Sequence, residues 1–168
     1  VDGDTSTNDT VLAFATGKAM EDKNERIISR TSDPRLIKFR EAFSEVMHDL
    51  AIQIVKDGEG AKKLIQIKVS GAENTSSAKK IARSIADSPL VKTAVAGEDP
   101  NWGRIIMAIG KSKVSVNLNK LNINFGEIKI VDKGQLLENY SEEDAKRYMR
   151  NEKIDFKINL NMGSKSFT

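Results

Sequence analysis

Residues Gly97 to Gly110 read GEDPNWGRIIMAIG, and this stretch decides how the rest of the chain is organised. Asp99 is suited to cap a helix, and Pro100 fits the first helical position, where a missing N–H costs nothing. Gly110 is placed to end the helix as its C′ residue. The stretch therefore predicts a helix whose apolar side consists of Ile105, Ile106 and Ile109, with Met107 and Ala108 filling in.

The first turn of this helix is crowded with groups that stability alone does not require, namely Glu98, Asn101, Trp102 and Arg104. Gly103 lies among them, and a glycine costs a helix interior about 1 kcal/mol relative to alanine. We therefore expect something nearby to need backbone room. The simpler interpretation, a capped core helix whose tryptophan packs inward, stays open.

Composition limits the possible functions of this 168-residue chain, a length that suits one domain or two small lobes. With 27 basic and 24 acidic residues the net charge is only +3, so a nucleic-acid partner is not expected. There is no cysteine and one histidine, His48, which excludes thiolate chemistry and a histidine-rich metal site. No apolar run approaches the roughly 20 residues that span a bilayer. These features favour a soluble, intracellular protein.

The chain opens with VDGDTSTNDT (Val1–Thr10), whose short polar side chains favour turns over helix. Val11–Ala15 is apolar and predicts a buried strand running into Gly17. A frayed polar terminus is the simpler interpretation of the opening. Because a strand follows at once and no methionine precedes Val1, we expect the chain to be cut from something longer, and to be incomplete at both ends.

Asp33 and Pro34 repeat the pattern of a cap followed by proline and predict a helix over residues 34–55. Its apolar positions recur at helical spacing over about five turns: Leu36, Phe39, Phe43, Val46 or Met47, Leu50 and Ile54. His48 lies in this helix without a second histidine to orient it, so we interpret it as structural or solvated.

Glu59 lies on a turn between two glycines, Gly58 and Gly60, and Leu64–Ser70 then alternates as a half-buried strand. A carboxylate held at the mouth of a strand can accept a charge-assisted hydrogen bond from a substrate ammonium. From spacing alone, a solvated turn acid is the alternative.

The remaining segments predict two more helices, each with a polar cap. Asn74 or Thr75 caps a helix that ends near Ser88-Pro89 and has a small apolar face of Ala78, Ile81, Ala82 and Ile85. Ser141 with Asp144 imitates a capping box and predicts a helix through Met149.

Alternation predicts the strands. Leu90–Ala96 is apolar enough for a short strand, and the runs 114–118, 121–125 and 128–130 predict an antiparallel meander. Residues 154–160 alternate as a last strand, after which Asn161–Thr168 offers no closing element. This order predicts an α+β fold, a layered α/β sandwich with a mixed, largely antiparallel sheet.

Spacing reveals no Ser-His-Asp set, phosphate loop or metal cluster. Three stretches, however, taken together resemble the ornithine acetyltransferase family, the bifunctional glutamate N-acetyltransferases of arginine biosynthesis. They are VDGDTSTNDT (1–10), DGEGAK (57–62) and AGEDPNWGRIIMAIG (96–110), and they follow one another at family-like separations with helix 34–55 between the first two.

The resemblance implies a precursor that cuts itself before a threonine, which becomes the amino terminus of the β chain. That threonine takes the acetyl group of N-acetylornithine and the acyl-enzyme passes it to glutamate, without acetyl-CoA, metal or other cofactor. An N-terminal amine can act as the base for the hydroxyl on its own residue. Backbone or hydroxyl donors stabilise the tetrahedral oxyanion, and losing one typically costs ~10²–10³ in rate.

This sequence departs from the family pattern because the nucleophilic threonine, the C-terminal tail and the α chain with its oxyanion donors are all absent. None of the threonines in 1–10 replaces that nucleophile, so we expect no catalytic residue in this chain. By resemblance, Glu59 is the substrate-binding glutamate. The resemblance places the following residues as support for the cleft or a subunit interface: Asp2, Thr5, Asn8, Asn101, Trp102 and Arg104.

We therefore expect part of a β chain with a substrate-cleft lobe at roughly 1–110 and a meander and C-terminal lobe at 111–168. The expected partners are the α chain, in an α2β2 heterotetramer, and the small molecules N-acetylornithine, ornithine, glutamate and possibly acetyl-CoA. The expected location is the cytoplasm, or the mitochondrial matrix of a eukaryote. A self-processing amidase, a secondary-pathway acetyltransferase and a non-catalytic interaction module are the alternatives.

Overall fold

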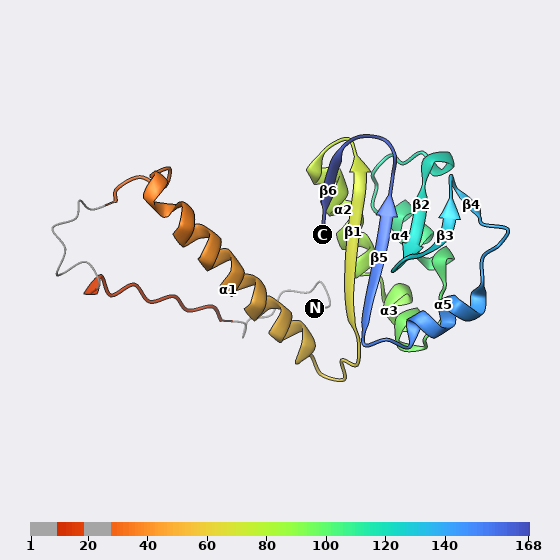
Figure 1. Cartoon of the computed structure of the whole chain (residues 1–168), viewed down its shortest axis with the longest axis horizontal. Helices are drawn as coiled ribbons and strands as arrows, with labels where there is room; N and C mark the ends of the chain where they lie inside the picture. The colour runs from red at the N-terminus through yellow and green to blue at the C-terminus, as the bar shows by residue number, and fades with distance from the viewer. Residues whose placement is uncertain (1–9, 19–27) are drawn as a thin grey trace. The chain divides into compact units, whose positions relative to one another are not determined.

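The computed structural model of the chain describes residues 10–18 and 28–168. These residues form two units: the helix unit, which ends at Val55, and the sheet unit, Lys56–Thr168. Figure 1 labels their elements. The lobe boundary expected near residue 110 falls inside the sheet unit.

The helix unit is built on α1 (Ile37–Lys56), which follows a short 3-10 turn, η2 (Pro34–Leu36). Asp33 is the N-cap, as predicted, and its side chain accepts a hydrogen bond from Arg35 N at 2.9 Å. No residue of α1 is buried. The strand predicted at Val11–Ala15 is wrong, because these residues are exposed and have no neighbouring strand in the described part of the unit to take their backbone hydrogen bonds.

The sheet unit contains a six-stranded sheet in the order β4-β3-β2-β5-β1-β6. β1 and β5 are parallel, with Leu64 opposite Lys153, and every other neighbouring pair is antiparallel. The mixed, largely antiparallel sheet is therefore confirmed. The strands are β1 (Leu64–Ala72), β2 (Asn122–Phe125), β3 (Ile128–Asp132), β4 (Gln135–Leu136), β5 (Lys153–Asn159) and β6 (Lys165–Phe167).

Two strand predictions differ from the structure. The run 114–118 is not a strand, because Asn117 caps a 3-10 turn, η3 (Leu118–Lys120), by accepting from Asn119 N at 3.1 Å. The chain does have a closing element, since β6 pairs with β1 through Val69 opposite Phe167. Three residues, Lys-Ser-Phe, are too few to show alternation, so this edge strand gave no sequence signal.

Four helices belong to the sheet unit: α2 (Thr75–Ala86), α3 (Pro89–Ala96), α4 (Trp102–Lys111) and α5 (Glu142–Met149). Figure 1 shows α2, α3 and α4 behind the sheet, so they form the second layer on one of its faces. The caps predicted at Asn74 and Ser141 are confirmed. The strand predicted at Leu90–Ala96 is wrong, because Ser88 caps a helix there and Pro89 takes its first position.

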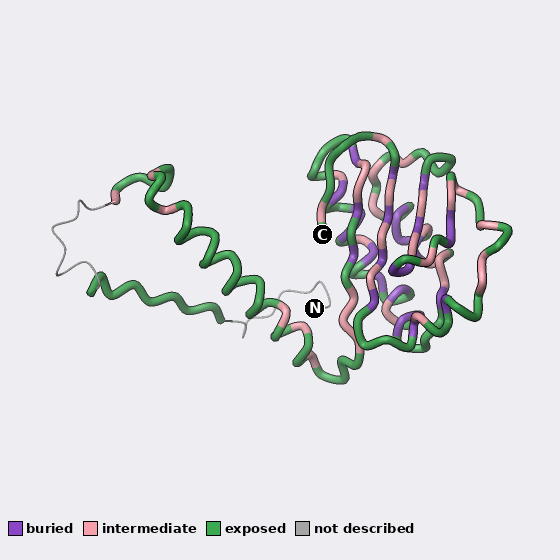
Figure 2. The backbone as a smooth tube through the Cα atoms, in the orientation of Figure 1, coloured by how far each residue is buried: buried purple, intermediate pink, exposed green. Residues whose placement is uncertain are grey.

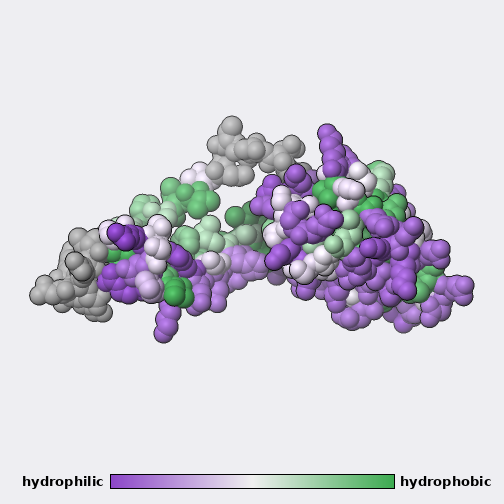
Figure 3. Space-filling model, turned by 90° about the horizontal axis from the view of Figure 1, so that it is seen from above, coloured by the Kyte–Doolittle hydropathy of each residue, from purple (hydrophilic) through white to green (hydrophobic). Residues whose placement is uncertain are grey.

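The core lies between this helical layer and the sheet. The face of α2 is buried as predicted, and inward residues of β1 and β5 alternate with exposed or half-buried ones. Figure 2 shows buried residues throughout the sheet unit and none along α1. In Figure 3 the surface of the sheet unit is mostly hydrophilic, whereas the part that contains α1 displays apolar residues.

Candidate functional site

Glu59 lies on a tight turn a few residues before β1. Ala61 N donates to Gly58 O at 2.9 Å, which closes the turn, and Gly60 has φ +71°. A positive φ at the third position is the mark of a type II turn and explains the glycine there. Glu59 therefore takes the second position, where its side chain is exposed. It makes no hydrogen bond or ion pair with the residues that the structure describes, so its carboxylate is open to a ligand.

The helix predicted from Asp99 to Gly110 exists as α4, but its N-cap lies two residues later than predicted and its C-terminal end is later as well. Asn101 is the N-cap, accepting from Arg104 N at 3.2 Å. Trp102 N bonds Pro100 O at 3.0 Å and Asn101 has φ −80° and ψ 82°, which is an inverse γ-turn that delays the helix. Gly110 lies inside α4, whose C-cap is Ser112, so the C′ assignment is wrong.

The structure shows what three of the predicted support residues contact. Trp102 is partly buried against the core, as the simpler interpretation predicts. Arg104 Nη1 donates to Leu90 O at 2.8 Å and to Thr93 Oγ1 at 2.9 Å, so it joins α4 to α3. Asn101 Nδ2 donates to Asp99 Oδ2 at 3.1 Å. All three contacts hold the α3–α4 connection in place.

Two further expectations concern Gly103 and the chain's opening segment. A methyl group at Gly103 would meet only Asn101 Oδ1 at 3.4 Å among the described residues, so no contact there requires the glycine. The remaining predicted support residues, Asp2, Thr5 and Asn8, lie outside the described residues.

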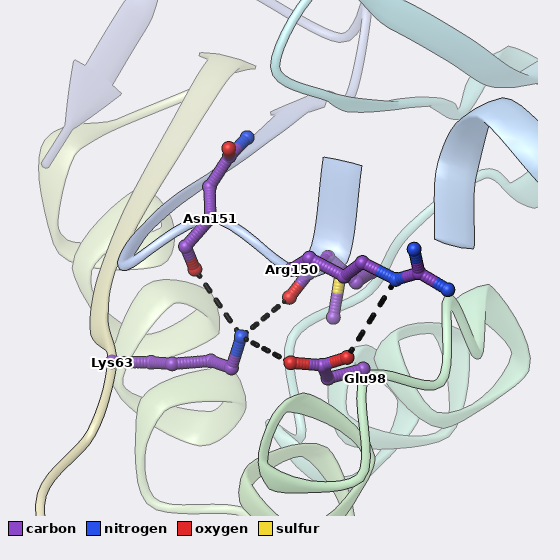
Figure 4. A network of polar contacts seen from close by, with 5 residues as sticks. Lys63, Glu98, Arg150 and Asn151 are labelled. Atoms are coloured by element: carbon purple, nitrogen blue, oxygen red, sulfur yellow. Dashed lines mark hydrogen bonds and ion pairs between the residues drawn. The ribbon is translucent and has the colours of Figure 1, made fainter. Parts of the chain in front are cut away.

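Lys63 is a residue that sequence reasoning missed. Its ammonium donates to Glu98 Oε1 at 3.1 Å, Met149 O at 2.7 Å and Asn151 O at 3.3 Å, and its side chain is only 12% exposed (Figure 4). Arg150 Nε lies 4.0 Å from the second oxygen of Glu98. The sequence did contain a signal for this position. Lys63 is an even number of residues from the inward residues Ile67 and Val69 of β1, so alternation along the chain places it on the same side.

Glu98 contributes to this cluster from a constrained backbone. It follows the end of α3 with φ +58°, a left-handed conformation that is uncommon for a residue other than glycine. Glu98 N donates to Val95 O at 3.1 Å, and Asp99 N donates to Ala94 O at 2.8 Å. The α3–α4 connection therefore presents the Glu98 carboxylate to Lys63 while it positions Asn101 and Trp102.

A shallow surface hollow of about 660 Å³ lies between β3 and α5 and includes Tyr140 and Tyr148. Tyr148 OH accepts from Asp155 N at 2.8 Å, and burial is the main cause that raises the pKa of Tyr148. Burial also raises the pKa of Tyr140, with smaller contributions from Glu142 and Asp99. None of the site residues predicted from the sequence lines this hollow.

Within residues 10–18 and 28–168, no group of three or more histidine, cysteine, aspartate or glutamate side chains could hold a metal ion. Nor does any helix in these ranges have the length and hydropathy needed to cross a membrane.

Fold and site together define a two-layer α+β domain in which a glycine-framed carboxylate precedes the first strand and a partly buried lysine anchors the start of that strand. A family model described as the ArgJ family matches residues 1–168, and the chain belongs to this family. The family resemblance seen in the sequence is therefore confirmed. The family comprises enzymes of arginine biosynthesis.

Individual relatives agree with this membership. The chain is 49% identical over its whole length to the "Arginine biosynthesis bifunctional protein ArgJ" of Agrobacterium fabrum, of which it covers 40%. It is 50% identical over 97% of its length to the protein of the same name from Bradyrhizobium diazoefficiens, covering 39% of it. The chain thus spans about 40% of the length of these relatives.

The fold agrees with a solved structure. The crystal structure of the arginine biosynthesis bifunctional protein ArgJ from Bacillus halodurans matches with a TM-score of 0.87 and 41% sequence identity. The match covers 99% of this chain and 76% of the crystallised one. The predicted fold class is therefore confirmed.

Proposed function

We propose that this chain is part of the β chain of a glutamate N-acetyltransferase, which moves the acetyl group of N-acetylornithine to glutamate through an acyl-threonine. The observation that carries the proposal is the family match over residues 1–168, together with relatives that are named as bifunctional proteins of arginine biosynthesis. The nucleophile and the oxyanion donors lie outside this chain.

Chain lengths support the proposal that the precursor is cut in two. This chain covers 76% of the crystallised Bacillus chain but 40% of the Agrobacterium relative, so the crystallised chain is about half as long as that relative. Cleavage before a threonine gives that residue a free amine, which can take the proton of its own hydroxyl. The other part of the precursor is the proposed α chain, and two copies of each form the proposed α2β2 assembly.

Glu59 is the proposed contact for the amino group of the bound amino acid. Its turn holds the carboxylate at the surface, with no ion pair or hydrogen bond to any residue that the structure describes. A substrate ammonium can therefore bind without displacing an internal partner. A hydrogen bond to a charged group contributes about 1.5–3 kcal/mol, which corresponds to roughly 10- to 100-fold in affinity.

The overall activity is tested by mixing the full-length, self-processed enzyme with acetyl-labelled N-acetylornithine and unlabelled glutamate, without acetyl-CoA. The expected result is labelled N-acetylglutamate. Release of labelled acetate without transfer to glutamate would instead indicate an amidase, and would contradict the proposal.

The role of Glu59 is tested with Glu59→Ala in the full-length enzyme. We expect the KM for N-acetylornithine to rise about 10- to 100-fold while self-cleavage continues. Glu73→Ala is the matched control, because Glu73 is an exposed acid on the loop after β1. An unchanged KM in Glu59→Ala would refute the proposed contact.

A further inference from the structure

We propose that Lys63 is a positioning residue for Glu59, in that its anchored ammonium fixes the point at which the Glu59 turn meets β1. This inference rests on the proposed function of Glu59. Lys63 joins three segments that are distant in sequence: the start of β1, the α3–α4 connection and the end of α5 (Figure 4).

The contacts of Lys63 exclude a direct role in binding substrate. An ammonium group has three N–H donors. Lys63 has three acceptors, Glu98 Oε1 and the carbonyl oxygens of Met149 and Asn151, at 2.7 to 3.3 Å. All of its donors are therefore used within the protein, and the side chain is nearly buried. Lys63 can therefore act on a ligand site only by holding other residues in place.

Two of the acceptors of Lys63 lie where negative charge or partial negative charge is concentrated. Met149 is the last residue of α5, so its carbonyl oxygen lies at the negative end of the helix, where a cation is stabilised. Glu98 adds a full negative charge and is itself 45% exposed. An apolar side chain at position 63 would leave these acceptors without their shared donor and remove this link between the α3–α4 connection and the start of β1.

Glu59 is only four residues from this anchor. In the segment 57–62, the backbone hydrogen bond from Ala61 N to Gly58 O closes the turn on itself. Among the described residues, the nearest hydrogen bonds that follow the turn and reach the rest of the sheet unit are those of the Lys63 ammonium and of Leu64 N, which donates to Glu152 O at 2.7 Å. Loss of the ammonium would leave Leu64 as the first fixed point, and the turn could then move more widely.

The experiment compares Lys63→Met with Lys62→Met in the full-length, self-processed enzyme. Both substitutions remove one ammonium, but Lys62 is exposed and Lys63 is not. We expect Lys63→Met to raise the KM for N-acetylornithine about tenfold with kcat within twofold, because a misplaced carboxylate weakens ground-state binding. We expect Lys62→Met to leave both constants unchanged. A Lys63→Met variant with unchanged KM would overturn the inference.

The double variant Glu59→Ala/Lys63→Met separates this inference from the proposed function. If Lys63 acts through Glu59, the double variant has the same KM as Glu59→Ala alone. A further tenfold rise would show that Lys63 acts independently and would overturn the inference while leaving the role of Glu59 intact. An unchanged KM in Glu59→Ala alone would overturn both.

Lys63→Met could also prevent folding, and Glu98→Gln provides a second route. This substitution keeps the shape and one acceptor at the Lys63 ammonium but removes the negative charge. We expect a KM rise of about two- to fivefold in the same direction, with self-cleavage as the measure of a folded precursor. If Glu98→Gln folds and leaves the KM unchanged, the inference is overturned.

Discussion

The helices α1 and α2 both carry a regular apolar stripe, yet the two units of this chain use these stripes differently. Every predicted apolar residue of α2 is buried in the core of the sheet unit, whereas no residue of α1 is buried. Phe39 and Phe43 of α1 contact each other, with ring centroids 5.8 Å apart. Periodicity thus predicts where an apolar face lies, but it does not say what covers that face.

The difference has an energetic consequence. Most of the stability of a protein helix comes from packing its apolar face rather than from intrinsic propensity. The sheet unit gains that stability from its own core. In the helix unit, α1 depends on its length of 20 residues and on its capped start.

The largest expected effect comes from the same substitution made in both units. Phe156 in β5 is 2% exposed and packs against Phe125 at a centroid distance of 4.6 Å. We expect Phe156→Ala to lower the free energy of unfolding of the sheet unit by about 3–5 kcal/mol. Phe43 is 47% exposed, and we expect Phe43→Ala to cost less than about 1 kcal/mol.

Urea unfolding of the 168-residue chain measures both effects. The only tryptophan, Trp102, packs on the core of the sheet unit, so its fluorescence reports that unit, while circular dichroism also includes α1. If Phe43→Ala lowered the free energy of unfolding as much as Phe156→Ala, the proposed difference between the two units would be wrong, because the apolar face of α1 would then be covered.

A smaller effect concerns two glycines of the sheet unit. Gly126, in the turn between β2 and β3, has φ +57°, and an added Cβ would lie 2.6 Å from Tyr148 Cε2. A left-handed alanine costs about 1–2 kcal/mol and the overlap about 1–3 more, so we expect Gly126→Ala to destabilise by roughly 2–5 kcal/mol.

Gly110→Ala is the control for this prediction. Gly110 lies inside α4, and nothing within 4 Å obstructs a methyl group there. We expect a gain of up to about 1 kcal/mol in the same urea experiment, because alanine is the better helix former. A loss at Gly110 would instead support the C′ position that the sequence suggested.

The sequence predicted the elements in which a strong local signal and burial agree. In α2 a polar cap and a helical apolar face agree with the buried residues, and in β5 the alternation of apolar residues agrees with the buried ones. Leu90–Ala96 shows the opposite case. Its apolar content predicted a strand, but Ser88 and Pro89 form a cap followed by proline, the same start signal as Asp33 and Pro34, and this signal determines a helix.

The candidate site was predicted only in part. The glycine-framed turn of Glu59 could be anticipated, because Gly60 supplies a positive φ that few other residues tolerate. The contacts of Lys63 could not be fully predicted, since the three residues that accept its hydrogen bonds, Glu98, Met149 and Asn151, lie 35, 86 and 88 residues away in sequence. Alternation along the chain places Lys63 on the same side as the inward residues of β1. Only the fold, however, brings Glu98 and the end of α5 close to it.

The smallest expected effect lies at the start of α1 and tests whether a helix without a core keeps a local stabilising contact. Hydrogen bonds from the Arg35 side chain, then from its backbone N–H, lower the pKa of Asp33 from 3.8 to about 2. Because the folded pKa is lower than the unfolded one, this contribution is present above pH 3.8 and is lost as the pH falls through about 2. Carbon NMR of the Asp33 carboxyl group should show the low midpoint, and Arg35→Ala should return it toward 3.8. Trp102 fluorescence should not follow this titration, because Asp33 belongs to the helix unit and the tryptophan to the sheet unit. A midpoint near 3.8 in the unsubstituted chain would mean that the capped start does not form independently, and that α1 needs a covered face to hold its first turn.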